Sequence, residues 1–237
     1  MTFLTVMPLR LTRPAGDLGA AAPWFPAVGA LLGAAAGGLL LAAEPLVGIQ
    51  VAATLAVIAL VAATGALHVD GLADCADGLG ARGGTRERRL EVMRDPATGV
   101  YGTLALLAWG LLMVGSLAGL GRDDALPALV TAAAIGRWSV LLHAATAAPA
   151  RPGGLGAGFA VTPAAVAIGA VLPVALALAI NPPLHALAAL AAGAAVGALT
   201  SLWARRMLGG RTGDTLGAAV ALGEVAVLLA LLATSGG

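Results

Sequence analysis

The sequence predicts an all-α, polytopic membrane protein, a single domain over residues 1–237 built from about seven transmembrane helices. Of its 237 residues, 59% are hydrophobic and only 11% are charged, whereas soluble domains carry about 25% charged residues. Uncharged, mainly apolar runs of about 18 residues or more recur, and each can cross a hydrocarbon core of about 30 Å as a helix. The net charge of +1 does not indicate nucleic-acid binding.

Each apolar run is expected to form one helix, with turn residues between neighbours. Glu44-Pro45 precedes the second run, and Asn181-Pro182-Pro183 separates the fifth from the sixth. The seven expected spans are Trp24–Ala43, Val47–Leu67, Val100–Leu120, Ala125–Ala148, Thr162–Ile180, Leu184–Ala204 and Thr215–Ala233.

The arginines predict the orientation of these spans. If the N-terminus is cytoplasmic, eleven of the thirteen arginines lie inside, Arg122 lies outside and Arg137 falls within a span. The inside set is Arg10, Arg13, Arg82, Arg86, Arg88, Arg89, Arg94, Arg151, Arg205, Arg206 and Arg211. Because cytoplasmic loops carry an excess of basic residues, we expect an inside N-terminus and an outside C-terminus in the inner (plasma) membrane.

Small residues recur at four-residue spacing in two spans. They form Gly29-x-x-x-Gly33-x-x-x-Gly37 and Gly193-x-x-x-Gly197. Such spacing lets helices approach closely in lipid, but in a chain with 34 glycines it also arises by chance. Both interpretations stay open.

Three ionisable residues fall inside spans: Arg137, His143 and Glu224. Such groups usually face the protein interior or a watery cavity. An Arg137–Glu224 ion pair is one hypothesis. The other places each side chain near an interface, with its charged end reaching water.

Charge is concentrated in His68–Gly102, which holds six of the twelve acidic residues and five of the thirteen arginines. We expect a cytoplasmic active-site loop at residues 68–99. Asp70, Asp74 and Asp77 stand at i, i+4 and i+7, within roughly 60° of one another on a helix. Three carboxylates on one face repel each other, and Mg²⁺ would relieve that repulsion. The alternative is a solvated acidic helix end.

The block continues with a glycine-rich turn and a basic stretch. Thr85–Arg94 reads as helical and ends at Asp95-Pro96, because the residue before proline disfavours the helical region. Its arginines either grip phosphate or pair with anionic lipid head groups. Arg82 and Arg94 are candidate phosphate contacts, and Asp95 is a candidate metal ligand or organiser of the phosphate site.

A second polar cluster, Leu208–Ala218, precedes the last span. Its glycines let backbone N–H groups approach an anion just before a helix N-terminus, where phosphate binds readily. The candidate substrate-binding residues are Gly209, Gly210, Arg211, Thr212 and Gly213. Asp214 is either a ligand or an N-cap. Arg151, in Arg151-Pro-Gly-Gly-Leu-Gly156, is expected on the same membrane side.

Together these motifs resemble the adenosylcobinamide-GDP ribazoletransferase family, also called cobalamin 5′-phosphate synthases. Cys75 stands where a small polar residue is common in the family. The matching pieces are Phe3-Leu-Thr…Pro8, Trp24-Phe-Pro, His68-x-Asp-Gly-Leu-Ala-Asp-x-x-Asp-Gly78, Glu87-Arg-Arg-Leu-Glu-x-Met-Arg-Asp95, Gly99-x-Tyr-Gly102, Arg151-Pro-x-Gly-Leu-Gly156 and Leu208-Gly-Gly-x-Thr-Gly-Asp-x-Leu-Gly-Ala218.

The resemblance implies a Mg²⁺-dependent membrane transferase of cobalamin biosynthesis with its active site facing the cytoplasm. It would join adenosylcobinamide-GDP to α-ribazole, or to α-ribazole 5′-phosphate, and release GMP. As a hypothesis, Asp70, Asp74 and Asp77 hold Mg²⁺ against the diphosphate, with Asp95 and Asp214 completing the site. Asp77 or Asp74 takes the proton of the attacking ribose hydroxyl, with His68 a weaker candidate base. Expected partners are the two substrates and the lipid bilayer. A homo-oligomer, or association with other cobalamin-assembly enzymes, stays open.

Two other functions fit part of the pattern. Asp74-x-x-Asp-Gly-x-x-Ala-Arg82 matches the first half of the motif of CDP-alcohol phosphotransferases, another Mg²⁺-dependent membrane family, but the match stops at Glu91. A divalent-cation transporter would use acidic residues along an ion path. Transport sites usually lie near the bilayer midplane, whereas nearly all acidic residues here are expected in loops.

Overall fold

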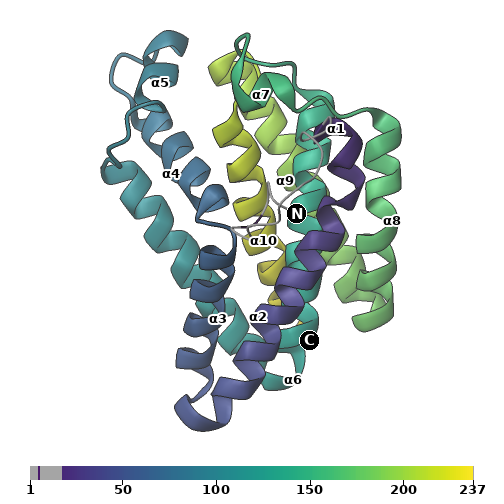
Figure 1. The fold of residues 1–237 in the computed structure, drawn as a ribbon. Coiled ribbons are helices and arrows are strands. Elements are labelled where there is room, and N and C mark those ends of the chain that lie inside the picture. The colour runs from purple at the N-terminus through teal and green to yellow at the C-terminus, as the bar shows by residue number, and fades with distance from the viewer. Residues whose placement is uncertain (1–4, 6–17, 237) are drawn as a thin grey trace, which may run out of the picture.

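The computed structural model describes Thr5 and residues 18–236, and over these residues the protein is a helical bundle without strands (Figure 1). Phe3, Leu4, Pro8, Arg10 and Arg13, which entered the sequence predictions, lie outside the described residues. The helices are α1 (Leu18–Ala21), η1 (Ala22–Trp24), α2 (Phe25–Val47), α3 (Ile49–Ala63), α4 (Leu67–Gly80), α5 (Arg86–Val92), α6 (Val100–Thr146), α7 (Gly154–Gly158), α8 (Pro163–Ile180), α9 (Pro183–Leu208) and α10 (Gly213–Ser235).

In the part of the chain that the structure describes, six helices are long and apolar enough to cross a membrane. One combines α1, η1 and α2, two are the halves of α6, and the others are α8, α9 and α10. The halves of α6 join at Gly121, where a φ of +80° reverses the chain. These six helices correspond to six of the seven predicted spans and confirm the predicted helical membrane fold. The inside-to-outside orientation stays a prediction.

The predicted second span differs from the structure at its C-terminal end. The prediction of one continuous helix to Leu67 is wrong, because α3 ends at Ala63 and the axis of α4 makes an angle of 90° with that of α3. The Thr64 hydroxyl donates back to the carbonyls of Leu60 (3.1 Å) and Val61 (3.0 Å), and Ala66 adopts a φ of +59°. At 1.5 Å per residue, α3 alone covers only about 22 Å. Over the described residues, the bundle therefore has seven spans only if the bent pair counts as one.

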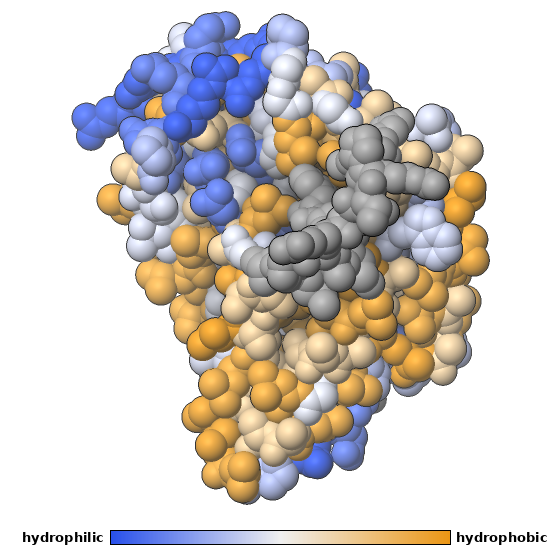
Figure 2. Space-filling view, in the orientation of Figure 1, coloured by the Kyte–Doolittle hydropathy of each residue, from blue (hydrophilic) through white to orange (hydrophobic). Residues whose placement is uncertain are grey.

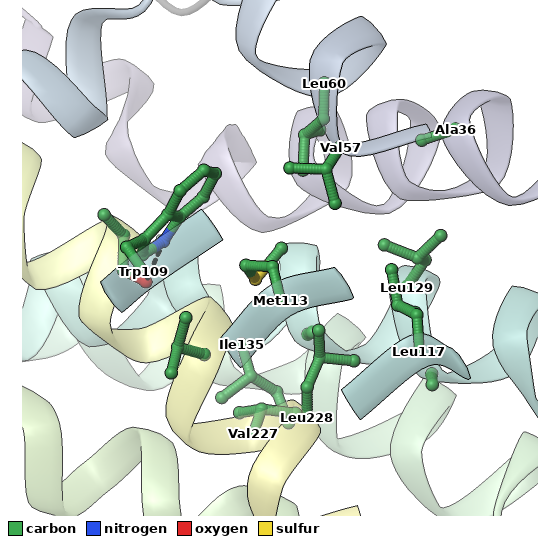
Figure 3. Packing of buried hydrophobic residues seen from close by; sticks show 14 of the residues in the cluster. Ala36, Val57, Leu60, Trp109, Met113, Leu117, Leu129, Ile135, Val227 and Leu228 are labelled. Atoms are coloured by element: carbon green, nitrogen blue, oxygen red, sulfur yellow. Dashed lines mark hydrogen bonds between the residues drawn. The ribbon is translucent and has the colours of Figure 1, made fainter. Parts of the chain in front are cut away.

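The second half of α6 and α10 are the most buried spans, and the other helices pack around them. Apolar side chains from α3, both halves of α6 and α10 interlock in this core (Figure 3). The indole N–H of Trp109 donates to the carbonyl of Ala221 at 3.1 Å, joining the first half of α6 to α10. Labelled members of the cluster include Val57, Leu60, Met113, Leu117, Leu129, Ile135, Val227 and Leu228.

The glycine series in α2 and α9 are packing faces, so the first of the two interpretations is confirmed. A Cβ on Gly29 or Gly33 would collide with the backbone of α6 at Ala133 or Leu129. A Cβ on Gly197 would come within 2.8 Å of the carbonyl oxygen of Ser139. Both helices thus lie directly against the second half of α6, as small residues permit in lipid.

Arg137 and Glu224 form the ion pair that the sequence suggested. Arg137 Nη1 lies 2.5 Å from Glu224 Oε1, and the two side chains are 0% and 4% exposed. Arg137 also donates to the carbonyl of Ala133 at 3.0 Å. The alternative, in which each charge reaches an interface, is therefore wrong. The pair joins α6 to α10 in the middle of the bundle.

We expect Glu224→Leu alone to destabilise the protein by about 3 kcal/mol, because it leaves Arg137 charged and buried without a partner. Replacing both residues, Arg137→Met with Glu224→Leu, should recover most of that loss. The control is Glu44→Leu, which removes the exposed pair with Arg122 and should cost less than about 1 kcal/mol. Thermal unfolding in detergent micelles measures all three. Equal losses in the single and double variants would contradict the assignment.

Candidate functional site

The three aspartates of α4 lie on one face of a helix, as their spacing predicted. Hydrophilic residues gather over α4 and α5 at one end of the bundle, while its sides are largely apolar (Figure 2). Asp74 lies within electrostatic range of the carboxylates of Asp214, Asp70 and Asp77. Four carboxylates from α4 and α10 therefore act on one another in a small region.

Asp77 connects α4 to the start of α6. Its two carboxylate oxygens accept hydrogen bonds from the backbone N–H groups of Gly99 (2.7 Å) and Gly102 (2.9 Å). Both donors belong to the N-terminus of α6, where a negative charge is favoured. A Cβ at either glycine would collide with the Asp77 carboxylate. Asp77 thus has a structural role that the sequence pattern alone did not reveal.

Gly71 allows α10 to approach the acidic face. A Cβ at Gly71 would lie 2.6 Å from the carbonyl oxygen of Asp214. A larger residue would push the start of α10 away from α4 and separate Asp214 from Asp70 and Asp74. A glycine between two aspartates in the sequence was the available signal for this contact.

The N-terminus of α10 is capped by Thr212, not by Asp214. Thr215 N–H donates to Thr212 Oγ1 (3.2 Å), and Thr212 N–H donates to Thr215 Oγ1 (2.9 Å), a reciprocal capping box. His143 Nε2 lies 2.9 Å from Thr215 Oγ1 and fixes this turn to α6. The N-cap alternative for Asp214 is therefore wrong. Its carboxylate accepts only the Thr212 hydroxyl, at 3.2 Å, among the described residues.

Arg211 holds three segments together. Its guanidinium donates to the carbonyls of Gly156 (2.8 Å), Ala144 (3.1 Å) and Ala147. The side chain is buried, and burial lowers the pKa of the guanidinium. An isolated backbone bridge also joins Arg211 to Pro149. Arg211 was predicted as a substrate contact. Its guanidinium instead donates to backbone carbonyls and holds the loop that contains Gly209, Gly210 and Gly213 in place.

Two other arginines border the acidic region. Arg151 lies within electrostatic range of Asp214, and its Nη1 is buried without a hydrogen-bond partner among the described residues. Arg86 Nη2 donates to the carbonyl of Ala150, and its guanidinium lies against Gly209. The three loops that the sequence placed on one side of the membrane therefore lie together.

The remaining predicted site residues are exposed near α5 or, in the case of His68, buried on another side of α4. Asp95 is exposed and accepts the N–H of Ala97 in a local turn (2.9 Å). Arg82 and Arg94 are exposed on the segments that flank α5. His68 is only 5% exposed. Because it lies two positions before Asp70, its side chain leaves α4 in a direction about 160° from that of Asp70. Its Nε2 has no partner among the described residues.

The acidic group suits a cation that needs few protein ligands. Within residues 18–236, no three His, Cys, Asp or Glu side chains are placed so that they could hold one ion by themselves. Mg²⁺ is usually bound by one or two carboxylates and completed by water and substrate phosphates. Neighbouring carboxylates that repel one another have the chemistry of such a site, and so does Arg151, whose Nη1 has no partner within the part of the chain that the structure describes.

Fold and site together define a polytopic helical membrane protein with an acidic site at one end, bordered by arginine and glycine loops. The profile of the family described as cobalamin-5-phosphate synthase matches residues 1–232. The chain belongs to the cobalamin-5-phosphate synthase family.

Curated relatives support the same assignment. A protein from Klebsiella pneumoniae subsp. pneumoniae is 43% identical over 224 residues, covering 88% of this chain and 85% of the relative. One from Bradyrhizobium diazoefficiens is 40% identical over 234 residues, covering 96% and 89%. Both relatives are named adenosylcobinamide-GDP ribazoletransferase. No solved structure matches the chain.

We expect Asp77→Ala to lower stability by about 1–3 kcal/mol, because it leaves two backbone N–H groups of α6 without their acceptor. Asp74→Ala should leave stability unchanged or raise it, since Asp74 accepts no hydrogen bond from residues 18–236 and its loss removes repulsion. Thermal unfolding of both variants in detergent tests the difference. A larger loss for Asp74→Ala would contradict the assigned roles.

Proposed function

We propose that this chain joins adenosylcobinamide-GDP to α-ribazole, or to its 5′-phosphate, and releases GMP in a Mg²⁺-dependent reaction. The observation that carries the proposal is the meeting of Asp70, Asp74, Asp214 and Arg151 at one end of the bundle, in a chain whose relatives are named for ribazole transfer. We further propose that this end faces the cytoplasm, in the inner membrane.

The reaction exchanges the phosphoanhydride bond of the diphosphate for a new phosphate ester bond. A ribose hydroxyl of the ribazole bonds to the phosphorus nearer the cobinamide, the bond from that phosphorus to the GMP oxygen breaks, and the hydroxyl loses its proton. Asp74 is the proposed base, because both Asp77 oxygens already accept backbone N–H groups and His68 points away from the acidic face. A positioned base of this kind contributes about 10²–10⁴-fold to a rate.

Mg²⁺ would be held by carboxylates from two helices. Asp70 and Asp74 of α4, with Asp214 of α10, are the candidate ligands, of which one or two would contact the ion directly, and Asp77 keeps α4 in place through α6. When bound, the cation would neutralise charge on the diphosphate oxygens. Arg151 Nη1, which is buried and has no hydrogen-bond partner among the described residues, is the proposed donor to a phosphate oxygen. Asp95, Arg82 and Arg94 stay candidate contacts on the exposed side.

The direct test is incubation of the purified protein in detergent with adenosylcobinamide-GDP, α-ribazole and Mg²⁺. We expect GMP to be released, and Asp74→Ala to lower kcat at least about 100-fold. Asp123→Ala is the matched control, because Asp123 is exposed beside Arg122, which pairs with Glu44 at the opposite end of the bundle. No GMP release above the Asp74→Ala background would overturn the proposed activity.

Cation binding can be measured without turnover. We expect the protein to bind Mn²⁺, detected by electron paramagnetic resonance, in competition with Mg²⁺. Asp70→Asn with Asp74→Asn should weaken that binding at least tenfold, because two of the three candidate ligands lose their charge. Asp123→Asn with Asp124→Asn should leave it unchanged. Undiminished Mn²⁺ binding in the Asp70→Asn, Asp74→Asn variant would show that the metal does not bind at α4. Mg²⁺ flux in proteoliposomes would favour the transporter alternative.

A further inference from the structure

A cavity of about 330 Å³ lies between α4, α9 and α10, on the side of α4 away from the acidic face. We call it the lateral groove. Its walls include Cys75, Ala76 and Leu79 of α4, Trp203 of α9 and Leu222 of α10. On a helix, Leu79 points about 160–180° away from Asp70 and Asp77. A group in the groove is therefore separated from the acidic face by the full width of α4.

The lateral groove is unsuited to water. Its lining is almost wholly apolar, with the Thr200 hydroxyl as one of few polar groups, whereas a buried water needs two to four polar partners. Folded proteins also keep few voids larger than a water molecule. The volume of about 330 Å³ is many times the space that one water molecule needs. An apolar chain is the occupant that its chemistry favours.

The groove opens toward the bilayer. Three of its lining leucines are strongly exposed on the bundle surface, Leu79 at 54%, Leu199 at 62% and Leu222 at 40%. Leu199 and Trp203 lie about 14 and 8 Å from the end of the α9 span, at 1.5 Å per residue. Leu222 lies at a similar distance from the start of the α10 span. The groove is thus at the depth of lipid acyl chains, near one membrane surface.

A basic residue stands where a lipid phosphate would lie. Leu199, Trp203 and Arg206 follow one another at i, i+4 and i+7 and share one face of α9. Arg206 is exposed in the last turn of the span, where an arginine can pair with a head-group phosphate. Trp203, between them, has the side chain typical of the membrane–water boundary.

We propose that the lateral groove binds one acyl chain of a membrane phospholipid whose phosphate pairs with Arg206. The bound acyl chain packs against the face of α4 opposite the acidic face, because Cys75, Ala76 and Leu79 form one wall of the groove. The site is independent of the proposed reaction, and it holds whether or not ribazole is the substrate.

The test is native mass spectrometry of the protein purified in mild detergent from phospholipid-containing membranes. We expect one retained phospholipid per chain. Ala76→Phe and, from a different helix, Leu222→Trp should each lower its occupancy at least tenfold by filling the groove. Ala191→Phe, on an exposed face of α9 outside the groove, should retain the lipid. Undiminished occupancy in both filling variants, or a lipid-free dimer covering this face, would overturn the proposal.

A second measurement uses Trp203 as the reporter. Phosphatidylglycerol with brominated acyl chains, added to the detergent-solubilised protein, should quench tryptophan fluorescence and saturate at one lipid per chain. Trp203→Phe should remove the saturable component, and Arg206→Ala should weaken it severalfold. Quenching that rises without saturation, or is equal in Trp203→Phe, would mean general contact with the micelle and would overturn the specific site.

Discussion

The break between α3 and α4 is the feature on which the arrangement of the site depends. Within a membrane, irregular backbone is tolerated only where protein groups satisfy it, and here Thr64 donates to two carbonyls of the turn that ends α3. Ala66 then takes a left-handed conformation, which is costly for a residue with a Cβ. The resulting 90° bend carries Asp70, Asp74 and Asp77 across the start of α10.

Neighbouring segments hold the redirected helix in place. Gly71 lets the backbone of α10 approach within contact distance, and Asp77 accepts two N–H groups from α6. On the other side, Arg211 holds the loop before α10 to α6 and α7 through backbone carbonyls. Each contact uses a polar or small residue from the motifs. Some motif residues therefore position the helices and do not take part in the proposed reaction.

The acidic group and the buried ion pair differ in whether their charges are neutralised within the protein. Arg137 and Glu224 neutralise each other in the core, where an unpaired charge would be very costly. The carboxylates around Asp74 are left in mutual repulsion at the end of the bundle, where solvent and cations can reach them. In a protein with so few charges, carboxylates that repel one another without a neutralising partner indicate a cation site. The group around Asp74 is therefore the proposed metal site.

The sequence by itself determined the membrane class, six of the spans and the acidic face of α4, because these follow from hydrophobic runs and helical spacing. It offered the Arg137–Glu224 pair as one of two alternatives, and the structure decided between them. Only the tertiary structure decided that the second span breaks after Ala63, that Thr212 rather than Asp214 caps α10, and that Arg211 donates to carbonyls. It also decided that Asp77 faces the N–H groups of α6 while His68 faces the core. These depend on which segments meet, and contacts between residues far apart in the chain leave no local pattern to read.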